Sequence, residues 1–230
     1  MFLILGISAY AQKRAPKTWE VGIFLGRSYY SGELNPRTHI GNGIGNFAFG
    51  ALGRYNLNRR YSLRGGVNFG GLNAEDENVD LPFNQFRMAR FESRFTEAHI
   101  LLEFNFMPYE LGEKKFPFSP YLYVGPGILF NNVDFYQESV VSIKKEEDQE
   151  NSSSTRLTLP FGFGFKLNLG ERFGLSAEWG FRKAGDKIDG LPNELENKYQ
   201  NGKSYNKDWY SVAGIILTYR LSKKPICPAI

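Results

Sequence analysis

The sequence has one cysteine, Cys227, and no apolar run long enough to cross a bilayer as a helix. A lone cysteine excludes a framework of disulfides within the chain. A helical span would need about 20 consecutive apolar residues. Clustered metal ligands and a phosphate-binding glycine loop are absent too, so we expect no metal or other cofactor and no small-molecule substrate. The net charge of +4 is modest, and we expect no nucleic-acid partner.

Aromatic residues, in contrast, are abundant at 16% of the chain. The most regular stretch is 155–183, in which leucine or phenylalanine occupies every second position from Leu157 to Leu169. Glycine, polar residues and a lysine stand between them. Because successive side chains of a strand point to opposite faces, this stretch predicts two strands, each with one apolar face, joined by a tight turn at 170–172.

The same alternation recurs in six further stretches, at residues 19–30, 46–57, 61–72, 94–107, 120–130 and 208–221. Pro126 interrupts one of them and is expected at a bulge or a weakly paired position, because proline has no N–H to donate. Strands of roughly ten residues match a tilted crossing of a bilayer. The pattern therefore predicts about eight strands.

The connections between these strands alternate in length: long, short, long, medium, long, short, long. This asymmetry is typical of membrane barrels, which have short periplasmic turns and longer outside loops. Aromatic residues at strand ends would form the interfacial girdles. We therefore predict an all-β fold, a small up-and-down transmembrane antiparallel β-barrel. The alternative is a soluble lipocalin-like barrel, which would line its interior with the leucine and phenylalanine face.

The N-terminal residues indicate export. Residues 2–7 form a short apolar segment, and Ala9-Tyr10-Ala11 fits a signal-peptidase site. We therefore expect a signal-peptide remnant at 1–11 and a periplasmic segment at 12–18. The barrel would follow at 19–221 and a periplasmic tail at 222–230. The expected location is the outer membrane, with outer-membrane lipids as neighbours.

Charged residues on the inward face should fill the lumen. A barrel of this size has room only for side chains, and buried charges need partners. Four acids and four bases balance there, which argues against a porin. His99 could indicate a lipid-acting enzyme, but a hydrogen-bonded lumen histidine is the simpler interpretation and we expect no enzyme. The predicted lumen residues are Glu20, Arg54, Arg64, Glu97, His99, Glu103, Lys166, Glu178 and Arg182.

The predicted periplasmic segments are rich in basic residues. Eleven bases against three acids give this rim a net charge of +8, whereas two outside loops carry acidic runs. The rim could meet anionic lipid headgroups or dock a periplasmic partner. Cys227 is either an incidental thiol or the site of an intermolecular disulfide. The candidate docking residues are Arg59, Arg60, Lys114, Lys115, Arg172, Lys223, Lys224 and Cys227.

Five segments together resemble a known family. They are WEVGIFLGRSYYSGELNP, RFTEAHILLEFNF, LPFGFGFKLNL, EWGFRKAGDKIDG and DWYSVAGIILTYRLSKKPICP. In this order they are similar to the Bacteroidota outer-membrane barrels related to PorG, a component of the type IX secretion system. The resemblance implies a barrel that ties a periplasmic ring of partner proteins to the outer membrane. The alternatives are a surface-binding, adhesin-like barrel that would use loops 73–93 and 131–154, and a small lipid-acting barrel.

Overall fold

The computed structural model describes residues 17–31, 45–75, 89–115, 117–137, 150–183 and 209–221. The predicted signal-peptide remnant, most of the periplasmic segment 12–18 and the tail lie outside these ranges. So do Lys223, Lys224 and Cys227. Within the described residues no helix is long and apolar enough to span a membrane.

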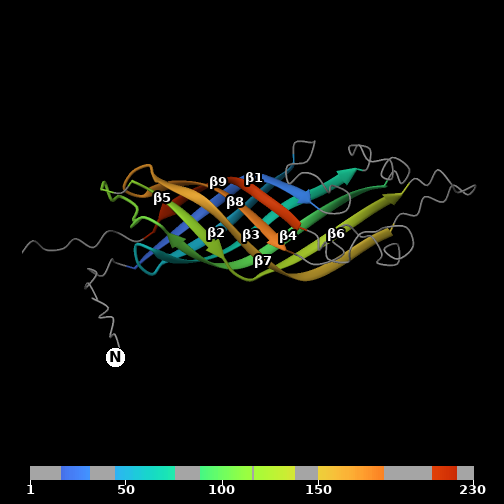
Figure 1. Ribbon diagram of the computed structural model, residues 1–230, viewed down its shortest axis with the longest axis horizontal. Coiled ribbons are helices and arrows are strands. Elements are labelled where there is room, and N and C mark those ends of the chain that lie inside the picture. The colour runs from blue at the N-terminus through green and yellow to red at the C-terminus, as the bar shows by residue number, and fades with distance from the viewer. Residues whose placement is uncertain are drawn as a thin grey trace, which may run out of the picture.

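The described residues form nine strands that close into an antiparallel ring (Figure 1). In chain order they are β1 (Thr18–Ser31), β2 (Asn46–Asn56), β3 (Tyr61–Glu75), β4 (Ala89–Asn105), β5 (Phe118–Val124), β6 (Gly127–Gln137), β7 (Glu150–Asn168), β8 (Phe173–Lys183) and β9 (Trp209–Arg220). Strands that follow one another in sequence pair, apart from β5 and β6, and β9 pairs with β1 to close the ring. The predicted up-and-down barrel is confirmed.

Strands β5 and β6 occupy one position in this ring. Both pair with β4 on one side and with β7 on the other, so the nine strands make an eight-stranded barrel. The break falls at Gly125 and Pro126, as the missing proline N–H predicts. The break stays hydrogen-bonded to both neighbouring strands. Ile100 of β4 donates its N–H to the Pro126 carbonyl at 3.0 Å, and Gly125 donates its N–H to the Pro160 carbonyl of β7 at 3.1 Å.

Four strands run further than predicted. β3 and β4 remain paired as far as Glu75 and Arg90, and β6 and β7 as far as Phe135 and Glu150. Figure 1 shows these four strands reaching beyond their neighbours at one end of the barrel. The predicted loops 73–93 and 131–154 were therefore too long. The alternation of apolar residues stops before these strands end. The hydrogen bonds of the ladder join backbone groups, so strand pairing continues through polar residues.

The two ends of the barrel are distinguished by their connections. We call the end that carries the short β2–β3 and β7–β8 turns the turn end, and the opposite end the loop end. β1 starts and β9 finishes at the turn end. The β4–β5 connection also lies there, and it contributes to the site described below.

The apolar face of the strands points outward. Phe163 is 45% exposed and Ile215 is 52% exposed, whereas the inward Glu103 and Glu97 are fully buried. A soluble barrel hides its apolar face inside, so this arrangement is the reverse of the lipocalin-like alternative. An apolar exterior around a polar interior is the arrangement of a membrane barrel.

Candidate functional site: the lumen and the turn end

Glu103 of β4 is the centre of a buried ion cluster. Its two carboxylate oxygens lie 2.8 Å from Arg54 Nε, 3.3 Å from Arg64 Nη1 and 2.6 Å from Lys166 Nζ. These cations come from β2, β3 and β7, so the cluster ties together strands on opposite sides of the barrel. Alternation along each strand directs all four side chains into the lumen.

Two further carboxylates balance the charge of this cluster. Glu20 of β1 accepts from Arg54 Nη1 at 2.9 Å, and Glu178 of β8 accepts from Arg64 Nη1 at 2.7 Å. The cluster therefore contains three cations and three anions. Each of these side chains is at most 5% exposed. Desolvated charges are tolerated only when opposite charges lie close enough to balance them.

Aromatic rings complete the packing around the ions. Tyr121 donates its hydroxyl to Glu178 at 2.8 Å, and Lys166 Nζ lies 4.5 Å from the centre of its ring. Arg64 lies 4.7 Å from the ring centre of Tyr123. Both positions are favourable for a cation over an aromatic face.

The glycines of the inward face make room for these tyrosines. A Cβ on Gly180 would lie 2.0 Å from the Tyr123 hydroxyl, and one on Gly164 would lie 2.7 Å from the Tyr121 ring. Both distances are below any real van der Waals contact. The glycines of β7 and β8 are therefore required by tyrosine side chains that lie over these two strands from the neighbouring β5.

A second polar cluster surrounds Glu97. Arg182 Nε lies 3.2 Å from one of its oxygens, and His99 Nδ1 lies 3.2 Å from the other. Tyr210 also donates its hydroxyl to Glu97. All nine predicted lumen residues thus lie inside the barrel, in the clusters around Glu103 and Glu97. They are Glu20, Arg54, Arg64, Glu97, His99, Glu103, Lys166, Glu178 and Arg182.

The lumen is not polar throughout, and this corrects the prediction that charged residues fill it. An apolar cluster of buried side chains fills much of its loop-end half: Phe24, Tyr30, Ala48, Leu52, Leu72, Phe95, Leu129, Tyr210, Val212 and Ile216. On β1, for example, Glu20 lies nearer the turn end and Phe24 nearer the loop end. The sequence prediction missed this cluster because it selected only charged side chains and His99 from the inward face as lumen residues.

The β4–β5 connection folds into the barrel at the turn end. Tyr109 is 7% exposed and Leu111 is 1% exposed. Tyr109 donates its hydroxyl to the Leu167 carbonyl at 3.3 Å, and burial raises the pKa of this phenol. Gly112 has a φ of 79°, a left-handed conformation that favours glycine and turns the chain back outward. We call residues 106–115 the plug segment.

Three side chains of the barrel hold the plug segment in place. Arg220 of β9 donates to the carbonyl of Leu111 at 2.5 Å and to that of Glu171 at 2.6 Å. Asn168 of β7 donates to the carbonyls of Glu110 and Glu113, both at 3.0 Å. Arg59 forms ion pairs with the carboxylates of the same two glutamates, at 3.2 and 3.4 Å.

These contacts change the description of the basic rim. Arg220, counted there from the sequence, is 4% exposed and belongs to the mouth of the lumen. Arg59 is partly exposed but is paired with Glu110 and Glu113. Arg60 donates to the Phe106 carbonyl at 2.7 Å, and Arg172 donates to the Tyr219 hydroxyl at 2.9 Å. Glu110 is buried as well, at 8% exposed, so the loss of Arg220 and Glu110 from the rim leaves its net charge unchanged. The value of +8 stays a prediction, because Lys13, Arg14, Lys223 and Lys224 lie outside the described residues.

Exposed cations nevertheless remain at the turn end. Lys114 and Lys115 lie on the solvent side of the plug segment, and Arg172 lies in the adjacent β7–β8 turn. The structure therefore brings Arg59, Arg60, Lys114, Lys115 and Arg172 to one end of the barrel.

Several residues of the site were not predicted from the sequence. Tyr121, Tyr123 and Tyr210 were detectable as large polar side chains at inward positions of regular strands. Tyr109 and Leu111 gave a weaker signal, because they lie in a connection without regular alternation. Among the described residues, no group of three or more histidine, cysteine, aspartate or glutamate side chains could hold a metal ion.

Solved structures of small outer-membrane barrels are similar to this chain. A major outer membrane protein from Thermus thermophilus is 14% identical with a TM-score of 0.52, over 89% of this chain and 99% of that one. The N-terminal β-barrel domain of Pseudomonas aeruginosa OprF is 12% identical with a TM-score of 0.45, over 88% and 99%. Neisserial surface protein A is 13% identical with a TM-score of 0.46, over 89% and 98%.

The similarity to the Thermus protein supports the fold and does not extend to function. No curated protein matches the chain. A family model described as a domain of unknown function, DUF6089, matches residues 1–229. The chain therefore belongs to the DUF6089 family.

Proposed function

We propose that this protein is a structural barrel of the outer membrane that docks a periplasmic protein assembly at its turn end. The observation that carries the proposal is the group of exposed cations on a closed turn end, above all Lys114 and Lys115. The resemblance to barrels of the type IX secretion system implies a partner of this kind, a ring of periplasmic subunits.

The outer surface supports placement in a membrane. Aromatic pairs ring the turn end, with ring centres 4.7 Å apart for Trp19 and Tyr55 and 5.2 Å apart for Phe173 and Tyr219. Phe161 and Trp209 form a pair near the loop end, 6.0 Å apart. Two aromatic girdles separated by an aliphatic band are typical of outer-membrane barrels. The short turns then face the periplasm.

The interior supports a structural role rather than transport. The ion clusters and the apolar cluster occupy the lumen with buried side chains, and the plug segment fills its turn end. A small barrel packed in this way has no wide aqueous path. Its functional surfaces are then the exterior and the two ends.

The plug segment supports docking because it presents its lysines on a fixed backbone. Asn168 and Arg220 bind the carbonyls of residues 110, 111 and 113, immediately before Lys114. A surface that is already ordered loses less conformational entropy when a partner binds. Complementary charge on the partner would speed association and set its orientation.

The test is reversal of these charges. Lys114→Glu together with Lys115→Glu should abolish co-purification of the periplasmic partner and block secretion of type IX cargo, because attraction becomes repulsion. The barrel itself should remain folded, since exposed charges contribute little to stability. Folding is read from the heat-dependent mobility of the barrel on gels. Arg59 is left unchanged because it holds the plug segment.

The matched control reverses two exposed cations near the other end, Arg27 and Lys183. This variant should keep both the partner and secretion. Normal secretion by the folded Lys114→Glu/Lys115→Glu variant would refute docking through the plug segment. If the rim instead serves lipid headgroups, the variant should insert less efficiently and show no selective secretion defect.

One observation favours a surface-binding role as a second candidate. The β3–β4 and β6–β7 pairs extend beyond the rest of the loop end and could present ligand-binding loops outside the cell. Deletion of residues 76–88 should then abolish attachment to the ligand without affecting secretion. The lipid-acting alternative has less support, because His99 is 7% exposed inside the lumen and contacts Glu97 rather than facing lipid.

A further inference from the structure

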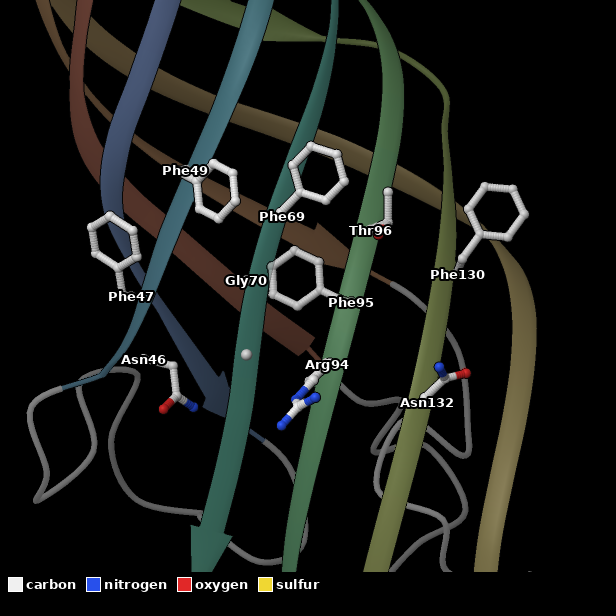
Figure 2. Close-up of a pocket in the computed structure, with 11 residues that line it drawn as sticks. Asn46, Phe47, Phe49, Phe69, Gly70, Arg94, Phe95, Thr96, Phe130 and Asn132 are labelled. Carbon is white, nitrogen blue, oxygen red and sulfur yellow. The ribbon is translucent and has the colours of Figure 1, made fainter.

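A hollow of about 520 Å³ lies in the outer wall of the barrel near the loop end (Figure 2). Residues of β2, β3, β4 and β6 line it. The part nearer the middle of the barrel is aromatic: Phe49 of β2, Phe69 of β3 and Phe130 of β6 are between 40% and 48% exposed on the outward face. The rings of Phe49 and Phe69 stack with their centres 5.3 Å apart.

The hollow exists because one outward position has no side chain. Outward residues alternate along β3, so Phe69 is followed on this face by Gly71. Gly71 lines the hollow, and a Cβ there would lie 3.3 Å from the Asn46 Cβ, so the small Asn46 side chain packs over the Gly71 backbone. Phe69 is level with Thr96 of β4, and Gly71 is level with Arg94. At the level of Arg94, nearer the loop end, β3 therefore contributes no side chain to the outer surface.

Polar groups form this second row. Arg94 pairs in register with Asn132 of β6, and both are exposed on the outward face. Figure 2 shows Asn46, Arg94 and Asn132 on the loop side of the aromatic rings. Beyond the backbone ladder, the Arg94 side chain takes part in none of the ion pairs or hydrogen bonds formed among the described residues. The hollow thus joins an aromatic surface to an exposed cation that forms no ion pair with the described residues.

We infer that this hollow binds a lipid of the outer leaflet that carries a phosphate in its headgroup. The acyl chains would lie against Phe49, Phe69 and Phe130, and the phosphate would accept hydrogen bonds from the Arg94 guanidinium. Arginine suits this role because its planar fork matches phosphate oxygens. The amides of Asn46 and Asn132 can donate to the same headgroup.

The charge and the position of the hollow select this occupant. A free anion would leave the aromatic surface uncovered, and a purely apolar partner would leave Arg94 without a counter-charge. Only an amphiphile with an anionic head satisfies both parts. The inference rests on the membrane placement of the proposed function, which sets the loop end in the outer leaflet, but it does not depend on a periplasmic partner.

The experiment compares two lipids with the same acyl chains, didecanoyl phosphatidic acid and didecanoylglycerol. Native mass spectrometry of the folded barrel in detergent should show tighter binding of phosphatidic acid. Arg94→Gln should reduce that preference about tenfold or more, the usual size of a charge-assisted hydrogen-bond contribution. Gly71→Leu should weaken binding of both lipids, because its side chain would occupy the hollow.

Lys183→Gln is the matched control, an exposed cation at the loop end of β8, outside the hollow. It should bind both lipids like the unchanged protein. Equal binding of both lipids by the unchanged barrel, or equal losses in Arg94→Gln and Lys183→Gln, would overturn the inference. A dimer that Gly71→Leu abolishes would show that a second copy covers the hollow instead.

These outcomes are distinguishable from failure of the proposed function. If the unchanged protein and every variant fail to fold into lipid, the membrane placement itself is wrong. If every variant folds but secretion does not depend on Lys114 and Lys115, the docking proposal is wrong. The lipid site is then judged by the lipid-binding measurements alone.

Discussion

The two halves of the lumen are packed by different means. Near the turn end, Glu103 holds three cations, and Glu20 and Glu178 balance them. Near the loop end, residues such as Phe24 and Ile216 form an apolar cluster like the core of a soluble protein. Apart from the buried Glu97–Arg182 pair, which Tyr210 of this cluster contacts, the apolar half requires only that volume be filled. The charged half requires that every group find its partner, because a partly paired buried network is more costly than an apolar one.

This contrast predicts different sensitivities to small changes. In the charged half, an isosteric substitution that removes one charge should be severe. In the apolar half, loss of one methylene should have a moderate cost. On the outer wall, a polar substitution should matter only because lipid surrounds it. The expected loss of stability is therefore largest in the charged half, smaller on the lipid-facing wall and smallest in the apolar half.

Glu103→Gln should have the largest effect, about 3–5 kcal/mol of lost stability, the cost of breaking a buried ion pair. The amide keeps the shape of the side chain but leaves Arg54, Arg64 and Lys166 with only two carboxylates. The measurement is equilibrium urea unfolding of the barrel in lipid vesicles, followed by tryptophan fluorescence. Glu113→Gln, which removes a partly exposed partner of Arg59, should cost less than about 1 kcal/mol. Similar losses of stability for both variants would show that the buried lumen cluster stabilises the barrel no more than a partly exposed ion pair does.

Phe163→Arg tests whether the leucine and phenylalanine face of the strands lies outside the barrel, against lipid. Phe163 points outward at a central position of β7, and a charge at the bilayer midplane should cost about 2–4 kcal/mol. Urea unfolding in the same vesicles gives the value. Phe163→Leu is the apolar control and should cost much less. An unchanged stability for Phe163→Arg would argue that this face does not contact lipid.

Ile216→Val should have the smallest effect, about 0.5–1.5 kcal/mol, because it removes one methylene from the apolar half of the lumen. The neighbouring Ile215→Val is a matched control on the outer face, where Ile215 is 52% exposed and lipid can fill the space that is left. Unfolding of the two variants under identical conditions should therefore differ. A larger loss for Ile215→Val would reverse the assignment of inside and outside on β9.

Much of the fold could be predicted from local pattern alone. Alternation along β1, β7 and β9 assigned Glu20, Lys166 and Ile215 to the faces on which the structure places them. Pro126 marked the break between β5 and β6. The ends of β3 and β4 could not be predicted in the same way, because pairing at Glu75 and Arg90 depends on the backbone of the neighbouring strand.

The candidate site was predictable in composition and not in arrangement. The sequence showed which charges face inward, but the register across several strands decides that Arg54, Arg64 and Lys166 all converge on Glu103. It also could not show that Glu110 and Glu113 are held by Asn168. Such contacts join residues more than 50 positions apart, and no local periodicity reports them.

The sequence by itself determined the strands, their faces and the balance of charge on the inward side, because a period of two is a property of each strand alone. Closure of the ring decided the rest. It placed an apolar cluster beside the ion clusters, drew the plug segment into the turn end and left the hollow beside Gly71 open. These features arise where side chains from separate strands share one space, and only the packed tertiary structure specifies which of them meet.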